Sequence, residues 1–321
     1  MLTRRRFLQS VAATAAMPAV LRAAPDQPRK KLAIVCTVWW MQSHAQHMGD
    51  RFLTGYPWQG RWHRPPLDVV SVYVDQKPDN DLSAQRAEEY GFQVYPTIAE
   101  ALCCGGSKLA VDAVLVIGEH GDYPLTDIGQ KQYPRYRLFK EITEVYRHSG
   151  RSVPLFNDKH LSWHYDWAKE MVATSKELDF PFLAGSSLPV TWRMPDVDMP
   201  YGAKVEDALV VAYGPVDIYD FHALETLQCM VERRAGGETG VRAIQALRGE
   251  AVWDAGWWAP DLFTACLSRS HTLGQARSNF GHRYPTDAEI RQLCPEPVAY
   301  RIEYRDGLKA TMLLANGLVT D

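Results

Sequence analysis

Short runs of apolar residues recur over the first 190 positions of the chain, and each run is bounded by polar or turn-forming residues. Runs of this length are typical of strands that are buried on both faces of a parallel sheet. We predict such strands at six places: residues 31–38, 67–74, 93–95, 111–117, 153–156 and 180–184.

Amphipathic stretches separate these runs and predict helices. Gly91 directly follows one of the stretches and Gly150 comes two residues after another, and glycine is a common residue at the C-terminal end of a helix. Strands that alternate with helices at this spacing predict an α/β fold with a doubly wound parallel sheet of the Rossmann type. The predicted helices are residues 43–52, 82–90, 97–102, 136–148 and 163–178.

The pattern changes after about residue 190, where the predicted strands have the character of an antiparallel sheet. These strands and one helix lie at 207–213, 218–233 (the helix), 240–247, 299–304 and 310–314. We therefore expect a Rossmann-like domain over residues 30–190 and a smaller α+β domain over residues 191–321. The chain ends at Asp321 in what reads as the approach to a strand, so we expect this second domain to be short or incomplete.

Residues 1–24 have the order of an export signal. Arg4, Arg5 and Arg6 precede an apolar run at 11–20, and small residues follow at 23–24. This order is typical of a twin-arginine signal peptide, and it predicts export by the Tat translocon to the periplasm or beyond. The alternative is an ordinary basic amphipathic helix. The apolar run is too short for a permanent membrane span.

Composition narrows the classes of partner. The chain has 321 residues, of which 46% are hydrophobic and 23% charged, an ordinary balance for a globular protein of about two domains. Its formal net charge is −3, and loss of residues 1–24 would remove four arginines and no acid. A negative net charge argues against nucleic acid or an anionic membrane as partner. The six cysteines form no C-x-x-C pair, so we predict neither a disulfide framework nor a zinc ribbon.

The order of several segments resembles the Gfo/Idh/MocA oxidoreductase family over roughly residues 31–250. The similarity lies in residues 33–35 with 43–45, 87–91 with 94–102, 111–114, and 169–185. The resemblance implies that NAD or NADP binds in the first domain and that a carbon of a sugar or sugar-derived polyol is oxidised or reduced. It also implies a homo-oligomer formed through the second domain.

The segment that should hold the nucleotide pyrophosphate departs from the family pattern. The family has a G-x-G-x-x-G/A turn there, whereas this chain has Cys36-Thr37-Val38-Trp39-Trp40-Met41 and no glycine between residues 32 and 48. Glycines allow the backbone to approach the pyrophosphate closely, and the side chains of Val38, Trp39 and Trp40 would occupy that space. We interpret the segment as a reshaped or abandoned nucleotide site.

Five residues would contact a nucleotide if the resemblance holds: Thr37, Val38, Trp39, Asp75 and His120. Asp75 follows the second predicted strand, where an acid holds the adenosine ribose in this class of domain. A simple turn residue is the alternative reading of Asp75.

Catalytic candidates also follow from the resemblance. Asn157-Asp158-Lys159-His160-Leu161 occupies the place of the family's Glu-Lys-Pro-Leu motif, so Lys159 would orient the substrate hydroxyl and Asp158 would retain a carboxylate beside it. His222 takes the place of the family's acid-base histidine, with Glu225 one helical turn away. A surface Asp–Lys pair and a structural histidine are the alternative readings.

Histidines and acids also gather at the ends of several predicted strands. Residues after the carboxyl ends of parallel strands line a common crevice, and imidazole and carboxylate groups suit a divalent transition metal. The alternative ligand set is His44, His120, Asp158, His160 and His164. This set would make the protein a metal-dependent lyase or hydrolase; otherwise the histidines form a polar sugar site.

Aromatic residues are compatible with a carbohydrate ligand, although large rings are also common in protein cores. Residues 56–62 form an aromatic loop that we predict to be a lid. The leading hypothesis is thus an exported sugar or polyol oxidoreductase. The metal-dependent lyase or hydrolase is the second hypothesis, and a non-catalytic carbohydrate-binding protein is the third. The tryptophans that could stack on a sugar are Trp192, Trp253, Trp257 and Trp258.

Overall fold

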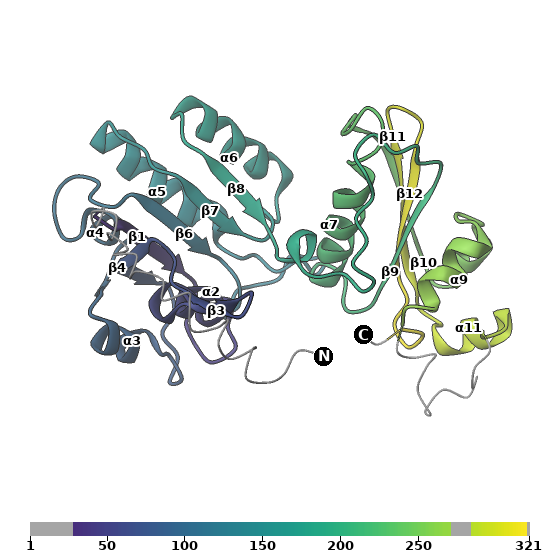
Figure 1. The fold of residues 1–321 in the computed structure, drawn as a ribbon, viewed down its shortest axis with the longest axis horizontal. Helices are drawn as coiled ribbons and strands as arrows, with labels where there is room; N and C mark the ends of the chain where they lie inside the picture. The colour runs from purple at the N-terminus through teal and green to yellow at the C-terminus, as the bar shows by residue number, and fades with distance from the viewer. Residues whose placement is uncertain (1–27, 271–283, 320–321) are drawn as a thin grey trace, which may run out of the picture.

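The computed structural model describes residues 28–270 and 284–319, so the predicted signal peptide (residues 1–24) lies outside the described residues. Figure 1 shows two layered units, each built on its own sheet and lying beside one another along the long axis. No helix within the described ranges is long and apolar enough to cross a membrane.

The first sheet has six strands, all parallel, in the order β5-β4-β1-β6-β7-β8. Within this sheet, β4 and β5 run outward from β1 on one side, and β6, β7 and β8 run outward from it on the other. This is the doubly wound order that the sequence predicts, and it places a crevice at the carboxyl ends of β1 and β6, where the order reverses. The strands are β1 (Lys30–Cys36), β4 (Leu67–Val74), β5 (Gln93–Tyr95), β6 (Ala113–Ile117), β7 (Leu155–Asp158) and β8 (Phe182–Gly185).

Helices cover both faces of this sheet because its strands are apolar on both sides. In β1, Ala33 and Val35 pack in one buried cluster with residues of α4 (Ile98–Cys103), α5 (Arg135–Ser149) and α6 (Tyr165–Glu177). Leu32, Ile34 and Cys36 pack in the opposite cluster, with α2 (His44–Thr54) and α3 (Ser83–Tyr90). The side chains of successive strand residues point to opposite faces, which accounts for this division.

The second sheet has the order β10-β11-β12-β9 and is mostly antiparallel, as predicted. One detail of the prediction is wrong: β9 runs parallel to β12 rather than antiparallel. The elements are β9 (Ala208–Ala212), α7 (Tyr219–Val231), β10 (Val241–Arg248), α8 (Glu250–Asp254), α9 (Pro260–Leu267), α11 (Asp287–Leu293), β11 (Val298–Tyr304) and β12 (Lys309–Leu314).

Helix α7 packs on one face of the second sheet, and in Figure 1 it lies between the two sheets. The shorter α8, α9 and α11 cover the opposite face. A short 3-10 helix (Leu188–Val190) follows β8 in the connection between the units. The position of α7 brings residues of the second unit to the edge of the crevice in the first.

The predicted aromatic lid is a two-stranded hairpin, β2 (Tyr56–Trp58) and β3 (Arg61–His63), that follows α2. Trp62 anchors it by donating a hydrogen bond from Nε1 to the carbonyl of Thr54, over 2.9 Å. The ring of Trp58 lies 6.5 Å from the ring of Trp192, in the connection between the two units. The hairpin therefore joins the outer end of α2 to that connection.

Candidate functional site

A cavity of about 370 Å³ lies at the carboxyl ends of the central strands, beside the start of α7. Its position is the crevice at which the strand order reverses, where open α/β sheets bind their ligands. Its volume is within the range of small-molecule sites. The wall includes Trp40, His120, Lys131, Tyr133, His160 and Asp217.

A buried group of charges lies at the floor of this region, where β6 ends. The carboxylate of Glu119 accepts a hydrogen bond from the guanidinium of Arg135 over 2.6 Å, and Nζ of Lys159 lies 3.5 Å from its other oxygen. Arg135 is fully buried, and the other two are nearly so. Gly118 is required here, because a Cβ at that position would lie 2.5 Å from Cγ of Arg135. Buried charges are stable only when they are paired, and this carboxylate pairs with two cations.

His160 is held next to the same arginine. Nη1 of Arg135 lies 3.0 Å from Nε2 of His160, and the ring packs at 5.1 Å from the ring of Phe221 in α7. Burial, followed by the charges of Arg135 and Lys159, lowers the pKa of His160 to about 3. His160 is therefore a neutral hydrogen-bonding group at physiological pH.

Asp158 and His44 form a second pair in the crevice. Nδ1 of His44 lies 2.5 Å from the carboxylate of Asp158, and its ring is edge-on to the ring of His120 at 5.1 Å. Burial and then the nearby His44 lower the pKa of His120. His120 and Lys159 both have left-handed backbones, with φ of 68° and 65°. Non-glycine residues in this conformation are uncommon, and they cluster at functional sites.

His222 lies in the first turn of α7. Its Nδ1 lies 3.2 Å from the hydroxyl of Ser186. Burial and then the positive charge of Lys159 lower its pKa, so the imidazole is neutral near pH 7. Asp158 ends β7 and Lys159 follows it, and the backbone N–H of Lys159 donates to the carbonyl of Gly185 over 3.0 Å, next to the serine that contacts His222.

The segment after β1 differs from the expectation that both tryptophans fill the nucleotide space. Thr37, Val38 and Trp39 are all buried, and Trp39 stacks on Phe92 at 6.0 Å within the core. Trp40 alone of the two tryptophans lines the cavity, with its ring 6.0 Å from that of His120. Of the five predicted nucleotide contacts, only His120 lies on the cavity wall.

The carboxylate of Asp75, at the end of β4, is bound by side chains of this chain itself. The hydroxyls of Tyr73 and Tyr123 each donate to it over 2.7 Å, and Arg137 lies 2.5 Å away. Burial raises the pKa of Asp75, but the hydrogen bonds from Tyr123, Tyr73 and Arg137 outweigh it and leave that pKa lowered. A ribose hydroxyl would have to share this carboxylate with those three groups or displace one of them.

Only part of the alternative metal-binding set comes together, since His44 lies beside Asp158 and His120. Within residues 28–270 and 284–319, no group of three or more His, Cys, Asp and Glu side chains is arranged to hold a metal ion. His164 is exposed at the start of α6 and packs against Trp167 at 5.0 Å. His160 lies beside Arg135, whose positive charge disfavours a bound cation. The reading of these histidines as metal ligands therefore lacks support from the geometry.

Arg135 and Ser186 were missed as site residues from the sequence. A signal for Arg135 existed, because it lies on the same helical face as Leu138, Phe139 and Ile142, all of which are buried. An arginine at this spacing from a buried apolar face indicates a buried charge that needs a partner. Ser186 carried no such signal.

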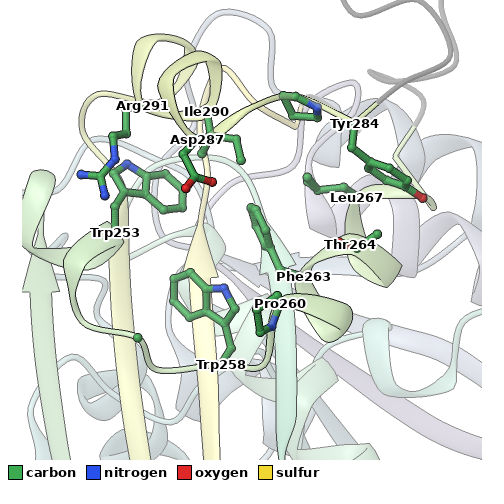
Figure 2. Close-up of a pocket in the computed structure, with 12 residues that line it drawn as sticks. Trp253, Trp258, Pro260, Phe263, Thr264, Leu267, Tyr284, Asp287, Ile290 and Arg291 are labelled. Atoms are coloured by element: carbon green, nitrogen blue, oxygen red, sulfur yellow. The ribbon is translucent and has the colours of Figure 1, made fainter.

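Three of the tryptophans considered for sugar binding are on or near the far face of the second sheet. Trp253 and Trp258 pack edge to face at 6.3 Å, and Trp253 donates from Nε1 to the carbonyl of Cys294. Together with Phe263 they border a separate cavity of about 320 Å³ (Figure 2). Trp257 packs against the same core cluster, on the opposite face of the sheet from α7. These rings therefore belong to the core packing of the second unit rather than to the crevice.

No protein-family profile and no curated protein matches the sequence. Among solved structures, GenD2 from gentamicin A biosynthesis in complex with NAD is 15% identical, with a TM-score of 0.51 over 93% of this chain and 69% of that one. A candidate dehydrogenase from Bordetella bronchiseptica RB50 is 14% identical, with a TM-score of 0.49 over 89% of this chain. This chain spans 60% of the length of that protein. The likeness to GenD2 confirms the two-domain fold that the sequence resemblance implies.

Proposed function

We propose that this protein is an oxidoreductase of the Gfo/Idh/MocA type that acts on a hydroxyl-bearing carbon of a sugar or sugar-derived polyol. The observation that carries the proposal is that residues 185 and 186 link Lys159 with His222 of the other unit: the N–H of Lys159 donates to the carbonyl of Gly185 over 3.0 Å, and Nδ1 of His222 lies 3.2 Å from Oγ of Ser186. A neutral imidazole next to a buried ammonium group is suited to accept the proton of a substrate hydroxyl. The order of residues 1–24 supports the further proposal that the protein acts outside the cytoplasm.

The proposed hydride acceptor is NAD or NADP. The fold and the position of the crevice fit a nicotinamide, and GenD2, of the same fold, was solved in complex with NAD. The adenosine end fits less simply, because Asp75 is already hydrogen-bonded to Tyr73, Tyr123 and Arg137. A nucleotide would therefore have to share Asp75 with these groups, displace one of them, or bind without it. When bound, the nicotinamide would supply the two-electron acceptor for the reaction.

The chain's own residues would manage the proton and the orientation of the substrate. Lys159 would donate a hydrogen bond to the substrate oxygen, and Glu119 keeps its ammonium group in place from 3.5 Å. His222 would remove the hydroxyl proton at Nε2. The Asp158–His44 pair borders the same space and adds hydrogen-bonding groups suited to further hydroxyls.

The direct test is to measure nucleotide binding and turnover on the same preparation. NAD⁺ and NADP⁺ are titrated by calorimetry, and a panel of sugars and polyols is then assayed for reduced nicotinamide by absorbance. The proposal expects binding of at least one nucleotide and turnover that Lys159→Met and His222→Gln strongly reduce. The exposed His47→Gln variant is the matched control, since it lies on α2 away from the crevice wall. Failure of both nucleotides to bind would refute the proposal.

One observation favours a second candidate, a carbohydrate-binding protein that uses no nucleotide. Tyr73, Tyr123 and Arg137 donate hydrogen bonds to the Asp75 carboxylate, at the place where a ribose hydroxyl would otherwise bind. The pair of hydrogen bonds that joins the Gln76 side chain to the backbone of Asp122 fixes the same loop. Sugar binding without nucleotide binding would favour this candidate.

A further inference from the structure

A continuous hydrogen-bond chain runs from His222 to Glu225 through Ser186. Nδ1 of His222 lies 3.2 Å from Oγ of Ser186, and the same hydroxyl makes a short hydrogen bond to the carboxylate of Glu225. The backbone N–H of Ser186 also donates to both oxygens of that carboxylate, over 3.1 and 3.2 Å. The hydroxyl therefore has a fixed position between the acid and the imidazole.

The donors and acceptors in this chain can be assigned from their chemistry. A carboxylate only accepts, so the single hydroxyl proton of Ser186 is directed to Glu225. The oxygen of Ser186 must then accept from His222, which requires a proton on Nδ1. In the neutral imidazole the other nitrogen, Nε2, consequently keeps its lone pair.

The same short segment also holds the backbone of the lysine. The N–H of Lys159 donates to the carbonyl of Gly185 over 3.0 Å, one residue before Ser186. Gly185 has a φ of 148°, and a Cβ there would lie 3.1 Å from the carboxylate of Glu225. Residues 185 and 186 thus connect the end of β7 with α7 across the two units.

We infer that Ser186 and Glu225 are positioning residues that keep His222 in the tautomer with Nδ1 protonated and Nε2 free to accept the substrate proton. The inference rests on the proposed function in taking His222 as the proton acceptor. Glu225 would also stabilise the imidazolium that forms, because its negative charge acts through the Ser186 hydroxyl. A merely structural role would hold the ring in place but would not select its tautomer or its proton affinity.

The test uses ring-nitrogen NMR of the full chain labelled with ¹⁵N-histidine, with the His222 signals assigned by comparison with His222→Gln. The variants are Ser186→Ala, Glu225→Gln and, as the matched control, Ser187→Ala, whose side chain is exposed and makes no cap hydrogen bond. Glu225→Gln is isosteric and keeps an oxygen that can accept from the backbone of Ser186. Unchanged signals of the other histidines would show that each variant keeps the native fold.

Wild type and Ser187→Ala are expected to show His222 protonated at Nδ1. Ser186→Ala should shift His222 toward the Nε2-protonated form, and Glu225→Gln should lower its pKa. An unchanged tautomer in Ser186→Ala, or an unchanged pKa in Glu225→Gln, would overturn the inference. Neither measurement requires nucleotide or turnover, so failure of the proposed function would show only in the titration described above.

Discussion

The guanidinium of Arg135 lies 3.0 Å from Nε2 of His160, and this contact fixes the protonation of the histidine. A guanidinium can only donate hydrogen bonds, so Nε2 must accept and the ring must be neutral with its proton on Nδ1. The pKa of His160 is about 3, compared with an ordinary value of 6.5. His160 is thus a neutral ring in the crevice wall rather than a pH-sensitive group, and its buried Nδ1 has no hydrogen-bond partner among the described residues.

This contact makes stability depend on pH in acid. The unfolded chain binds a proton at His160 below about pH 6.5, whereas the folded protein resists protonation down to about pH 3. The free energy of unfolding should therefore fall as the pH falls through this window, by at most ~1.4 kcal/mol per pH unit for this group. Urea denaturation at pH 7, 6, 5 and 4 measures the slope. In His160→Gln the free energy of unfolding should fall less steeply with pH, because the contribution of this group is gone. An identical slope in the variant would contradict the prediction.

The contact of Gly49 with Trp39 gives a second prediction. A Cβ at Gly49 would lie 2.7 Å from two atoms of the buried indole. Alanine would favour the helix by about 1 kcal/mol, but overpacking of a rigid core ring costs roughly 1–3 kcal/mol. Gly49→Ala should therefore lower the free energy of unfolding, as measured by chemical denaturation. In a Trp39→Phe background the smaller ring should accommodate the methyl group, so Gly49→Ala should lower the free energy of unfolding less there. An equal loss in both backgrounds would argue against this packing.

The layout of the first unit could be predicted from the sequence because buried parallel strands are continuous apolar runs. The strand predicted at 31–38 ends at Cys36 instead, since Val38 and Trp39 extend the apolar run although they belong to the following loop. Helices α8, α9 and α11 have five to eight residues, which is too short for a helical period to be recognised.

The site was only partly predictable. Lys159 and His120 could be placed at strand ends, and the strand order then brings them to one crevice. The direction of the Trp39 side chain could not be read from the sequence, because it depends on the space left by Gly49 in another element. The contact of Tyr123 with Asp75 joins residues 48 apart and depends on the path of a loop.

Tyr123 offers a way to test the adenosine subsite. Tyr123→Phe removes one hydrogen bond to Asp75, which should lower the free energy of unfolding by about 1 kcal/mol. If a nucleotide must displace Tyr123 to reach Asp75, the variant should bind it about fivefold more tightly, the factor that corresponds to about 1 kcal/mol. Calorimetric titration with NAD⁺ and NADP⁺ measures the change. Tyr136→Phe is the control, since it likewise removes a tyrosine–carboxylate hydrogen bond, to Glu170 over 2.6 Å, and equal affinities in the two variants would rule out this competition.

The proton affinity of His222 predicts the pH dependence of turnover. Burial and the charge of Lys159 lower its pKa below 6.5, so the neutral base predominates above that pH and is lost only in more acidic solution. The rate of hydroxyl oxidation should be level near pH 7 and should fall at acidic pH, and His222→Gln should reduce kcat roughly 10²- to 10⁴-fold.

Replacement of Lys159 tests why the pKa of His222 is lowered. Lys159→Met removes the nearby cation that lowers the pKa of His222, so the acidic limb of the profile should move to higher pH while kcat itself falls. Lys131→Met is the matched control, because Lys131 also lines the cavity but is not among the charges that perturb His222. Rates measured from pH 5 to 8 for both variants decide the point. An acidic limb that stays in place in Lys159→Met would show that burial alone sets the proton affinity of His222.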